Sequence, residues 1–244
     1  MYTWNWPVLW ATTSDGVSTY LGTLMHGLRW TLLVGLSAWV VALLFGTAVG
    51  IARTFKSGFV ARCAAGYVEL LRSIPLIVQM FIWFYVAPDL LPTGLADTLK
   101  AWDRYNVVAA ILCLSFFTSA RIAEQVRAGI EAIPAGQFHA ARALGMQTPQ
   151  VYRIVLVPVA FRKILPALTN EFVNIIKNTS VAFTIAVVEL MAATRSMQEM
   201  TFQIFEAFTA ATLIYLAVNL LVVKLMHFIE ARFEVPGLGI RQAR

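Results

Sequence analysis

Long stretches without a charged side chain constrain this sequence more than any other feature. Residues 30–52, 73–88, 105–120 and 207–223 contain no Asp, Glu, Lys or Arg. Each stretch approaches the roughly 17–25 residues that cross a bilayer as an α-helix. The sequence therefore predicts four membrane-spanning helices.

A fifth apolar stretch, residues 164–188, carries Glu171 and Lys177. Charged side chains within a span usually face the interior of a helical bundle or a water-filled path, because lipid does not solvate them. We therefore interpret this stretch as a fifth span.

The apolar residues come in continuous runs, whereas the strands of a membrane barrel alternate apolar and polar side chains. With 59% hydrophobic residues, 13% charged residues and a mean hydropathy of +0.71, the chain has too few polar side chains to cover a soluble domain. The predicted fold class is an all-α membrane protein with five transmembrane helices and a cytoplasmic helix–turn–helix loop.

The connections between these stretches differ in charge. The connection after the first span has three basic residues and no acid, and residues 121–163 have six basic residues and two acids. Acids balance the bases of the other two connections: Asp89, Asp97 and Asp103 in one, and Glu189 and Glu199 around Arg195 in the other. Because basic connections stay in the cytoplasm, we expect the N-terminus outside and the C-terminus inside. The net charge of +6 thus indicates membrane topology and not a nucleic-acid partner.

The two ends carry weaker signals. Residues 1–20 lack the basic start and cleavage site of a signal peptide, and Trp4, Trp6 and Trp10 are typical of an interfacial segment on the periplasmic side. Residues 235–244 are predicted to be a cytoplasmic tail. The histidines and cysteines lack metal-binding spacing, so neither a metal nor a cofactor is predicted on this chain.

The connection of residues 127–163 is far longer than a tight helix–helix turn requires. Gly145 is suited to end one helix in a left-handed conformation, Thr148 to cap a second helix opened by Pro149, and Pro158 to prevent a straightforward continuation of that helix. A helix pair of this kind packs on the membrane surface, on its own bundle or in the groove of a partner, and its pattern alone does not separate these.

The same loop resembles a known family. The run from His139 to Gly145, HAARALG, followed by VLVP at Val155 to Pro158, resembles the EAA loop of binding-protein-dependent ABC importer permeases. Alanines, glycine and proline are in register, while His139 replaces the acid of the pattern and Val155 and Val157 replace isoleucine and leucine.

Three further motifs resemble the polar amino acid permeases of that family, and the overall resemblance is closest to its glutamate/aspartate permeases. They occur in order along the chain: ELLRSIPLIVQ at Glu69 to Gln79, AEQVRAGI at Ala123 to Ile130, and KNTS at Lys177 to Ser180.

The resemblance implies an assembly. A permease domain spans residues 21–234, with a coupling loop at about 130–162, and it works with a second permease subunit, two ATPase subunits and a periplasmic binding protein. The chain contains no GxxxxGK[ST] motif, so ATP is expected on the partner and this chain is not an enzyme. The residues expected to couple to the ATPase are His139, Ala140, Ala141, Gly145, Val155 and Pro158.

Arg121 lies at the cytoplasmic side of the third span and needs a partner there. Three remain open: lipid headgroups, Glu124 three residues on, or a substrate carboxylate in the path. Related permeases commonly have tyrosine at this position, so the resemblance implies an anionic substrate.

Other polar residues are candidates for the path. Glu69 and Arg72 have the spacing of a structural pair, and Pro75 would loosen the second span. Gln79 is compatible with interhelical bonding or substrate contact, and Lys177 with pairing to Glu171 or to a carboxylate. The substrate-path candidates are Arg72, Gln79, Arg121, Glu124, Lys177, Asn178, Thr179 and Ser180.

Two other classes of protein are disfavoured. A secondary transporter usually has inverted repeats and more than five spans, and the sequence has no evident repeat. A membrane enzyme needs a convergent nucleophile, metal cluster or acid–base pair, and the histidines and cysteines offer none.

Overall fold

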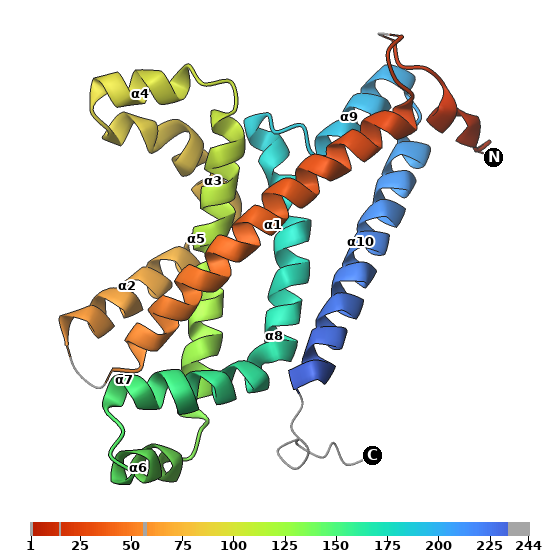
Figure 1. Cartoon of the computed structure of the whole chain (residues 1–244). Helices are drawn as coiled ribbons and strands as arrows, with labels where there is room; N and C mark the ends of the chain where they lie inside the picture. Colours follow the sequence, from red (N-terminus) through yellow and green to blue (C-terminus); the bar gives the residue numbers. More distant parts are fainter. Residues whose placement is uncertain (1, 15, 56–57, 234–244) are drawn as a thin grey trace.

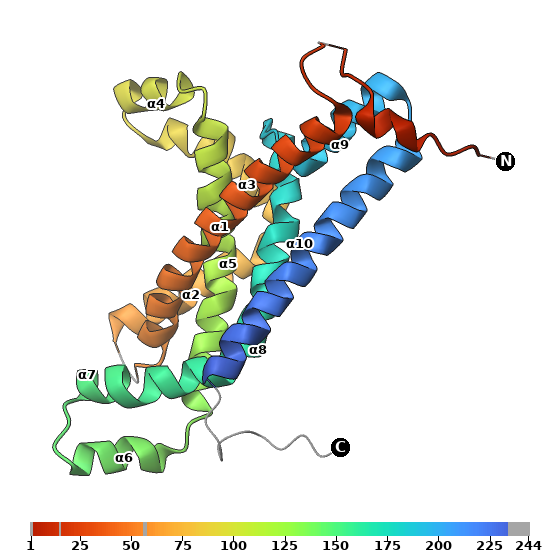
Figure 2. The ribbon, with the colours of Figure 1, turned by 45° about the vertical axis from the view of Figure 1, so that its right-hand side comes forward.

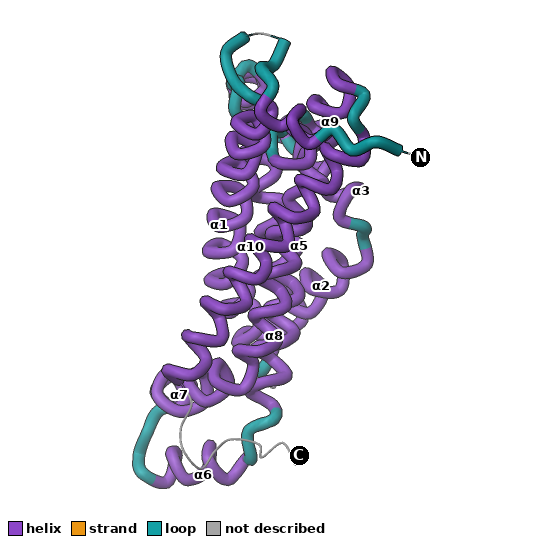
Figure 3. The backbone as a smooth tube through the Cα atoms, turned by 90° about the vertical axis from the view of Figure 1, so that its right-hand side faces the viewer, coloured by secondary structure: helices purple, strands orange, loops and turns teal. Residues whose placement is uncertain are grey.

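The computed structural model describes residues 2–14, 16–55 and 58–233, and the described residues form helices and contain no strand (Figures 1 and 3). In chain order the helices are η1 (Trp6–Trp10), α1 (Tyr20–Arg53), α2 (Phe59–Ser73), α3 (Leu76–Phe81), η2 (Ile82–Val86), η3 (Pro88–Leu90), α4 (Thr93–Lys100), α5 (Tyr105–Glu131), α6 (Ala135–Ala143), α7 (Thr148–Val151), η4 (Tyr152–Leu156), α8 (Val157–Asn178), η5 (Thr179–Ile185), α9 (Leu190–Thr201) and α10 (Ile204–Phe233). The predicted tail at 235–244 lies outside the described residues.

Three helices are long and apolar enough to cross a membrane unbroken: α1, α5 and α10. They contain the predicted spans 30–52, 105–120 and 207–223. At its start, α1 is capped by Thr19, whose Oγ1 accepts the N–H of Gly22 at 3.1 Å. From this end α1 crosses the bundle obliquely (Figure 1).

Small residues let α1 and α5 approach closely. A Cβ atom at Gly46 would lie 2.7 Å from the Ser119 carbonyl oxygen, and one at Gly50 would lie 2.7 Å from the Ala123 carbonyl oxygen. Such backbone contact between helices is the usual packing mode where lipid removes the hydrophobic drive for association. The face of α1 that carries Gly46 and Gly50, one helical turn apart, therefore packs directly against α5.

The other two predicted spans are broken. Residues 73–88 do not form a straight helix, because Pro75 separates α2 from α3 and the two segments meet at 105°. Residues 164–188 are likewise interrupted after η5, and α9 continues at 54° to the preceding helix. The described residues therefore contain three helices able to span a membrane by length and composition, or up to five spans if each bent pair counts as one.

The predicted helix–turn–helix is present as α6 and α7, at the end of the bundle opposite α4 and α9 (Figures 1 and 2). One detail of its prediction is wrong. Gln147, and not Thr148, is the N-cap of α7, in a reciprocal capping box with Gln150. Pro158 prevents a regular continuation of the helix, as predicted, since the chain passes into α8 through η4, a π-helical segment in which the Val157 N–H reaches the Tyr152 carbonyl. This wider turn absorbs a proline that lacks the N–H of a regular helix.

The main core joins α1, α5 and α8. Trp39 of α1 stacks on Phe172 of α8, with ring centroids 4.6 Å apart and planes within 5°. The N-terminal segment is fastened to the start of α10, where Tyr2 Oη and the Asn5 N–H both donate to the buried carboxylate of Glu206. Trp4 and Trp10 of this segment remain exposed.

Candidate functional site

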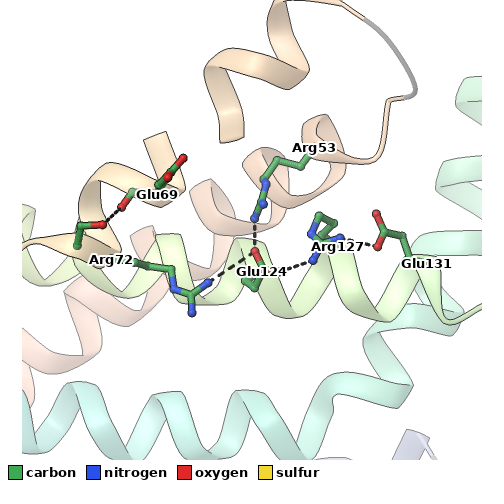
Figure 4. Close-up of polar contacts among 7 residues, drawn as sticks. Arg53, Glu69, Arg72, Glu124, Arg127 and Glu131 are labelled. Atoms are coloured by element: carbon green, nitrogen blue, oxygen red, sulfur yellow. Dashed lines mark hydrogen bonds and ion pairs between the residues drawn. The ribbon is translucent and has the colours of Figure 1, made fainter. Parts of the chain in front are cut away.

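Glu124 of α5 is the centre of an ion-pair cluster near the hairpin end of the bundle. Its carboxylate pairs with Arg53 at the end of α1 and with Arg127 one turn further along α5, and Arg72 at the end of α2 lies 3.8 Å away. Figure 4 shows these guanidinium groups converging on Glu124, while Arg127 also reaches Glu131. The cluster ties three helices together through one carboxylate.

The cluster contradicts one predicted pairing. Arg72 points to Glu124 and makes no ion pair with Glu69, and the backbone carbonyl of Glu69 accepts the Ser73 hydroxyl. Of the three partners left open for Arg121, Glu124 is not the one, because Arg53 and Arg127 are paired with its carboxylate. The i,i+3 spacing forms an ion pair for Glu124 and Arg127, but not for Glu69 and Arg72, where the arginine turns to an acid of another helix.

An open hollow of about 550 Å³ lies beside the cluster. Arg53, Glu69, Arg72, Ser73 and Glu124 provide its polar lining. The Arg72 side chain is half exposed, so its guanidinium is the most accessible of the three arginines around Glu124. The hollow therefore offers a cation and two carboxylates to solvent.

Gln79 of α3 holds the break at Pro75 in place. It is 3% exposed, and its Nε2 donates to the carbonyl oxygens of Leu71 at 2.7 Å and Ile74 at 3.0 Å. These carbonyls stand at the end of α2, where no following helical N–H is available to them. Gln79 thus bonds to backbone within its own bent pair, and not to another span.

Arg121 of α5 faces α8. Its Nη1 lies 3.6 Å from a carboxylate oxygen of Glu171, and the guanidinium lies 5.5 Å from the Phe117 ring centre. Glu171 also accepts from Gln125 at 3.2 Å. The Glu171 carboxylate is mostly buried, whereas the Arg121 side chain is 42% exposed. Arg121 is therefore a cation with one loosely held partner.

Lys177, Asn178, Thr179 and Ser180 lie where α8 tightens into the 3₁₀ helix η5. The Thr179 hydroxyl donates to the Ile176 carbonyl and the Ser180 hydroxyl to the Lys177 carbonyl, so both bond to their own helix. Lys177 is exposed and is not paired with Glu171. Because η5 packs against α3 and α5, the two broken segments of the chain meet beside α5.

The α6–α7 hairpin presents its motif residues unevenly. His139, Ala140 and Gly145 are exposed, Ala141 is buried and Val155 is half-buried. At Gly145 the backbone φ is +85°, as predicted. The Gly145 N–H reaches the Arg142 carbonyl and the Met146 N–H reaches the Ala141 carbonyl, which is the Schellman pattern for a helix end. Pro158 is exposed at the beginning of α8.

Glu189 is a buried polar centre, although the charge pattern of the sequence predicts a loop charge that balances Arg195. Its side chain is fully buried and caps α9, accepting the N–H groups of Met191 and Ala192 at 2.9 Å. Tyr215 of α10 donates to it at 3.0 Å, and Thr31 of α1 lies 3.5 Å away. An acid directly before an apolar helical run is an N-cap signal, and it identifies this role in retrospect.

Comparison with known proteins decides the family. Residues 23–235 match the family described as binding-protein-dependent transport system inner membrane component. The chain belongs to this family. It is 39% identical over 237 residues to the glutamate/aspartate import permease protein GltJ of Escherichia coli K12, covering 96% of both chains. It is 34% identical to the probable amino-acid ABC transporter permease protein PatM of Vibrio harveyi, covering 88% of this chain and 90% of that one.

A solved structure supports the same family. The crystal structure of an amino acid ABC transporter with histidines superimposes with a TM-score of 0.73 at 30% identity, over 87% of this chain and 95% of that one. As an inner membrane component of a binding-protein-dependent transport system, the chain is a multi-pass permease subunit. The resemblance seen in its motifs is thereby confirmed.

Proposed function

We propose that this permease subunit imports acidic amino acids, glutamate and aspartate, in an ATP-driven complex. A periplasmic binding protein delivers the substrate, a second permease subunit completes the path, and a pair of ATPase subunits binds and hydrolyses ATP. The observation that carries the substrate assignment is Arg121, an exposed guanidinium whose carboxylate partner is 3.6 Å away. The identity to a relative named as a glutamate/aspartate permease supports the same substrates.

The proposed topology has five spans with the N-terminus outside and the C-terminus inside. It counts α1, α5 and α10 as single spans and each bent pair as one further span. The hairpin end is the basic end: from Ala132 to Asn170 the chain has no Asp or Glu, and it has His139, Arg142, Arg153, Arg162 and Lys163. Basic ends of membrane helices remain in the cytoplasm, and this supports a cytoplasmic position for the hairpin.

The ATPase is proposed to dock on the α6–α7 hairpin through His139, Ala140, Ala141, Gly145, Val155 and Pro158. The hairpin protrudes from the inner end of the bundle (Figure 2), and Leu144 at its turn is 81% exposed. An exposed leucine among basic side chains suits a partner cleft with an apolar floor and an acidic rim.

Substrate recognition is proposed to proceed by exchange of carboxylates. A distance of 3.6 Å exceeds that of a charge-assisted hydrogen bond, so Arg121 keeps donors free for a second carboxylate. A substrate carboxylate in bidentate contact would replace Glu171, which Gln125 continues to hold. Lys177 and Asn178 lie at the neighbouring break and would attract or bond the same anionic ligand, with Thr179 and Ser180 shaping the break.

The inner end of the path is proposed to be the Glu124 cluster. Arg72 is exposed to the hollow there, and Gln79 fixes the turn from which Arg72 projects. A departing acidic amino acid would meet Arg72 on the cytoplasmic side, where Glu124 competes for the same guanidinium.

The decisive experiment is uptake by the complete complex in proteoliposomes, with the binding protein outside and ATP inside. Labelled glutamate and aspartate should accumulate only with ATP, and unlabelled histidine or arginine should compete poorly. Uptake that persists without ATP and follows a Na⁺ or H⁺ gradient would reject the importer, because it would identify a secondary transporter. Equal competition by basic amino acids would reject the acidic specificity alone.

A further inference from the structure

Tyr152 connects the hairpin to the end of α1. Its Oη lies 2.9 Å from the Oγ1 of Thr54, the C-cap residue of α1. Thr54 Oγ1 already donates its hydrogen to the Ile51 carbonyl at 2.7 Å. Since a hydroxyl has one hydrogen to donate, Tyr152 is the donor in the contact with Thr54. The Tyr152 ring also meets the Phe55 ring edge-on, with centroids 5.7 Å apart.

This contact holds a distinct place in the hairpin. Apart from the backbone bonds by which η4 continues into α8, it is the hydrogen bond that joins residues 135–156 to another helix among the described residues, since the other bonds of this segment close its own turns. Tyr152 also lies in the π segment η4, where the Val157 N–H is bonded to its carbonyl. The wider turn and the inter-helix bond therefore occur at one residue.

The bond leads directly to the ion-pair cluster. Thr54 follows Arg53, and Arg53 is paired with Glu124 of α5. Glu124 in turn holds Arg127 and lies 3.8 Å from Arg72 of α2. A shift of η4 that moves Thr54 thus acts directly beside Arg53, which is paired with Glu124.

We propose that Tyr152 is a positioning residue for transport, through which movement of the hairpin is passed to the end of α1 and then to the Glu124 cluster. The inference rests on the proposed ATP-driven function. Movement of Arg53 relative to Glu124 alters how Glu124 is shared with Arg72, and so alters the inner end of the path. Tyr152 contacts neither ATP nor substrate in this role.

The test separates coupling from both docking and folding. In Tyr152→Phe the ring contact with Phe55 is kept and only the hydroxyl is lost. Uptake and ATP hydrolysis are measured in the same proteoliposomes, with glutamate, aspartate and the binding protein present. Stimulated hydrolysis should persist, while amino acid imported per ATP hydrolysed should fall about fivefold, the effect of losing one ordinary hydrogen bond.

Three further variants sharpen the result. Thr54→Val should lower the same ratio. The double variant should be no worse than the poorer single variant, because each single variant already removes the hydrogen bond between Tyr152 and Thr54. Tyr105→Phe is the matched control, since it loses a hydroxyl bonded to the Trp83 carbonyl at the other end of α5. Its import per ATP should stay at the wild-type value.

Three outcomes would overturn the proposal. These are an unchanged ratio in Tyr152→Phe, an equal fall in Tyr105→Phe, and loss of stimulated hydrolysis in Tyr152→Phe, which would make Tyr152 a docking residue. A wild-type complex that does not require ATP for uptake is a different result, because it rejects the proposed function before any variant is compared.

Discussion

Arg121 and Glu171 face each other across the α5–α8 interface, with Nη1 and Oε2 3.6 Å apart. The two residues are 50 positions apart in the chain, and the arginine side chain is more than three times as exposed as the carboxylate. The pair is close enough to neutralise charge within a membrane protein, yet too long for a strong directed hydrogen bond. This combination suits a site that must release one carboxylate to accept another.

Replacement of Arg121 tests this exchange. Arg121→Ala should lower the uptake of glutamate and aspartate by about 10- to 100-fold, the range for loss of one charged hydrogen-bonding partner. The measurement is competition uptake with a panel of unlabelled amino acids. Arg195→Ala is the control, since Arg195 is half exposed on α9 and has Glu199 at 3.8 Å. An unchanged substrate profile in Arg121→Ala would remove this residue from recognition.

The turn of the hairpin is testable with two glycines that differ in one property. An added Cβ meets no atom within 4 Å at Gly145 or at Gly136, but only Gly145 has a left-handed φ. Gly145→Ala should therefore destabilise the hairpin by about 1–2 kcal/mol and reduce ATP-dependent uptake. Gly136→Ala should be neutral or stabilise α6 by about 0.5–1 kcal/mol. Equal activity of the two variants at equal expression would contradict the role of the turn.

Gln79 and Gln150 form hydrogen bonds through different atoms of the side-chain amide. Gln79 donates through Nε2 to two carbonyls, whereas Gln150 accepts the Gln147 N–H through Oε1 at 2.7 Å. Gln79→Glu should thus destabilise the protein by about 1–3 kcal/mol, because a carboxylate leaves buried carbonyls unsatisfied. Gln150→Glu retains its acceptor oxygen and should unfold at the same temperature as the wild type. Thermal unfolding of the purified protein measures both, and identical curves would refute the clamp at Pro75.

Loss of the Glu189 side chain should loosen α9. Glu189→Ala removes an N-cap that accepts two backbone N–H groups, which costs about 0.5–2 kcal/mol, and leaves Tyr215 without its acceptor. Glu189→Gln keeps an acceptor oxygen and should lose less. Hydrogen exchange of the first amides of α9 is the measurement. Wild-type protection in Glu189→Ala would show that α9 does not depend on this cap.

Features that depend on residues adjacent in the sequence could be predicted from the sequence alone. Uninterrupted apolar runs predicted α1, α5 and α10, and the local pattern around Gly145 predicted its positive φ. Contacts between residues that are distant in the sequence could not be predicted in this way. Glu124 pairs with Arg53 of α1 as well as with Arg127 of its own helix, and Arg121 lies beside an acid of α8. Arg72 turns to Glu124 of α5 and not to Glu69, its predicted i,i+3 partner, because the fold brings the more distant residue close. The break at Pro75 likewise depends on Gln79, whose bonding requires the bend itself.

The glycine contacts between α1 and α5 restrict how a transporter of this design is able to move. At Gly46 and Gly50 the backbone of α1 lies directly against α5, and α1 has no side chain there whose rotamers would accommodate sliding or rotation. They are expected to travel as a single rigid body. Opening and closing then falls to the segments that are already interrupted, at Pro75 and after η5, so the same two interruptions serve as hinges for the rest of the subunit.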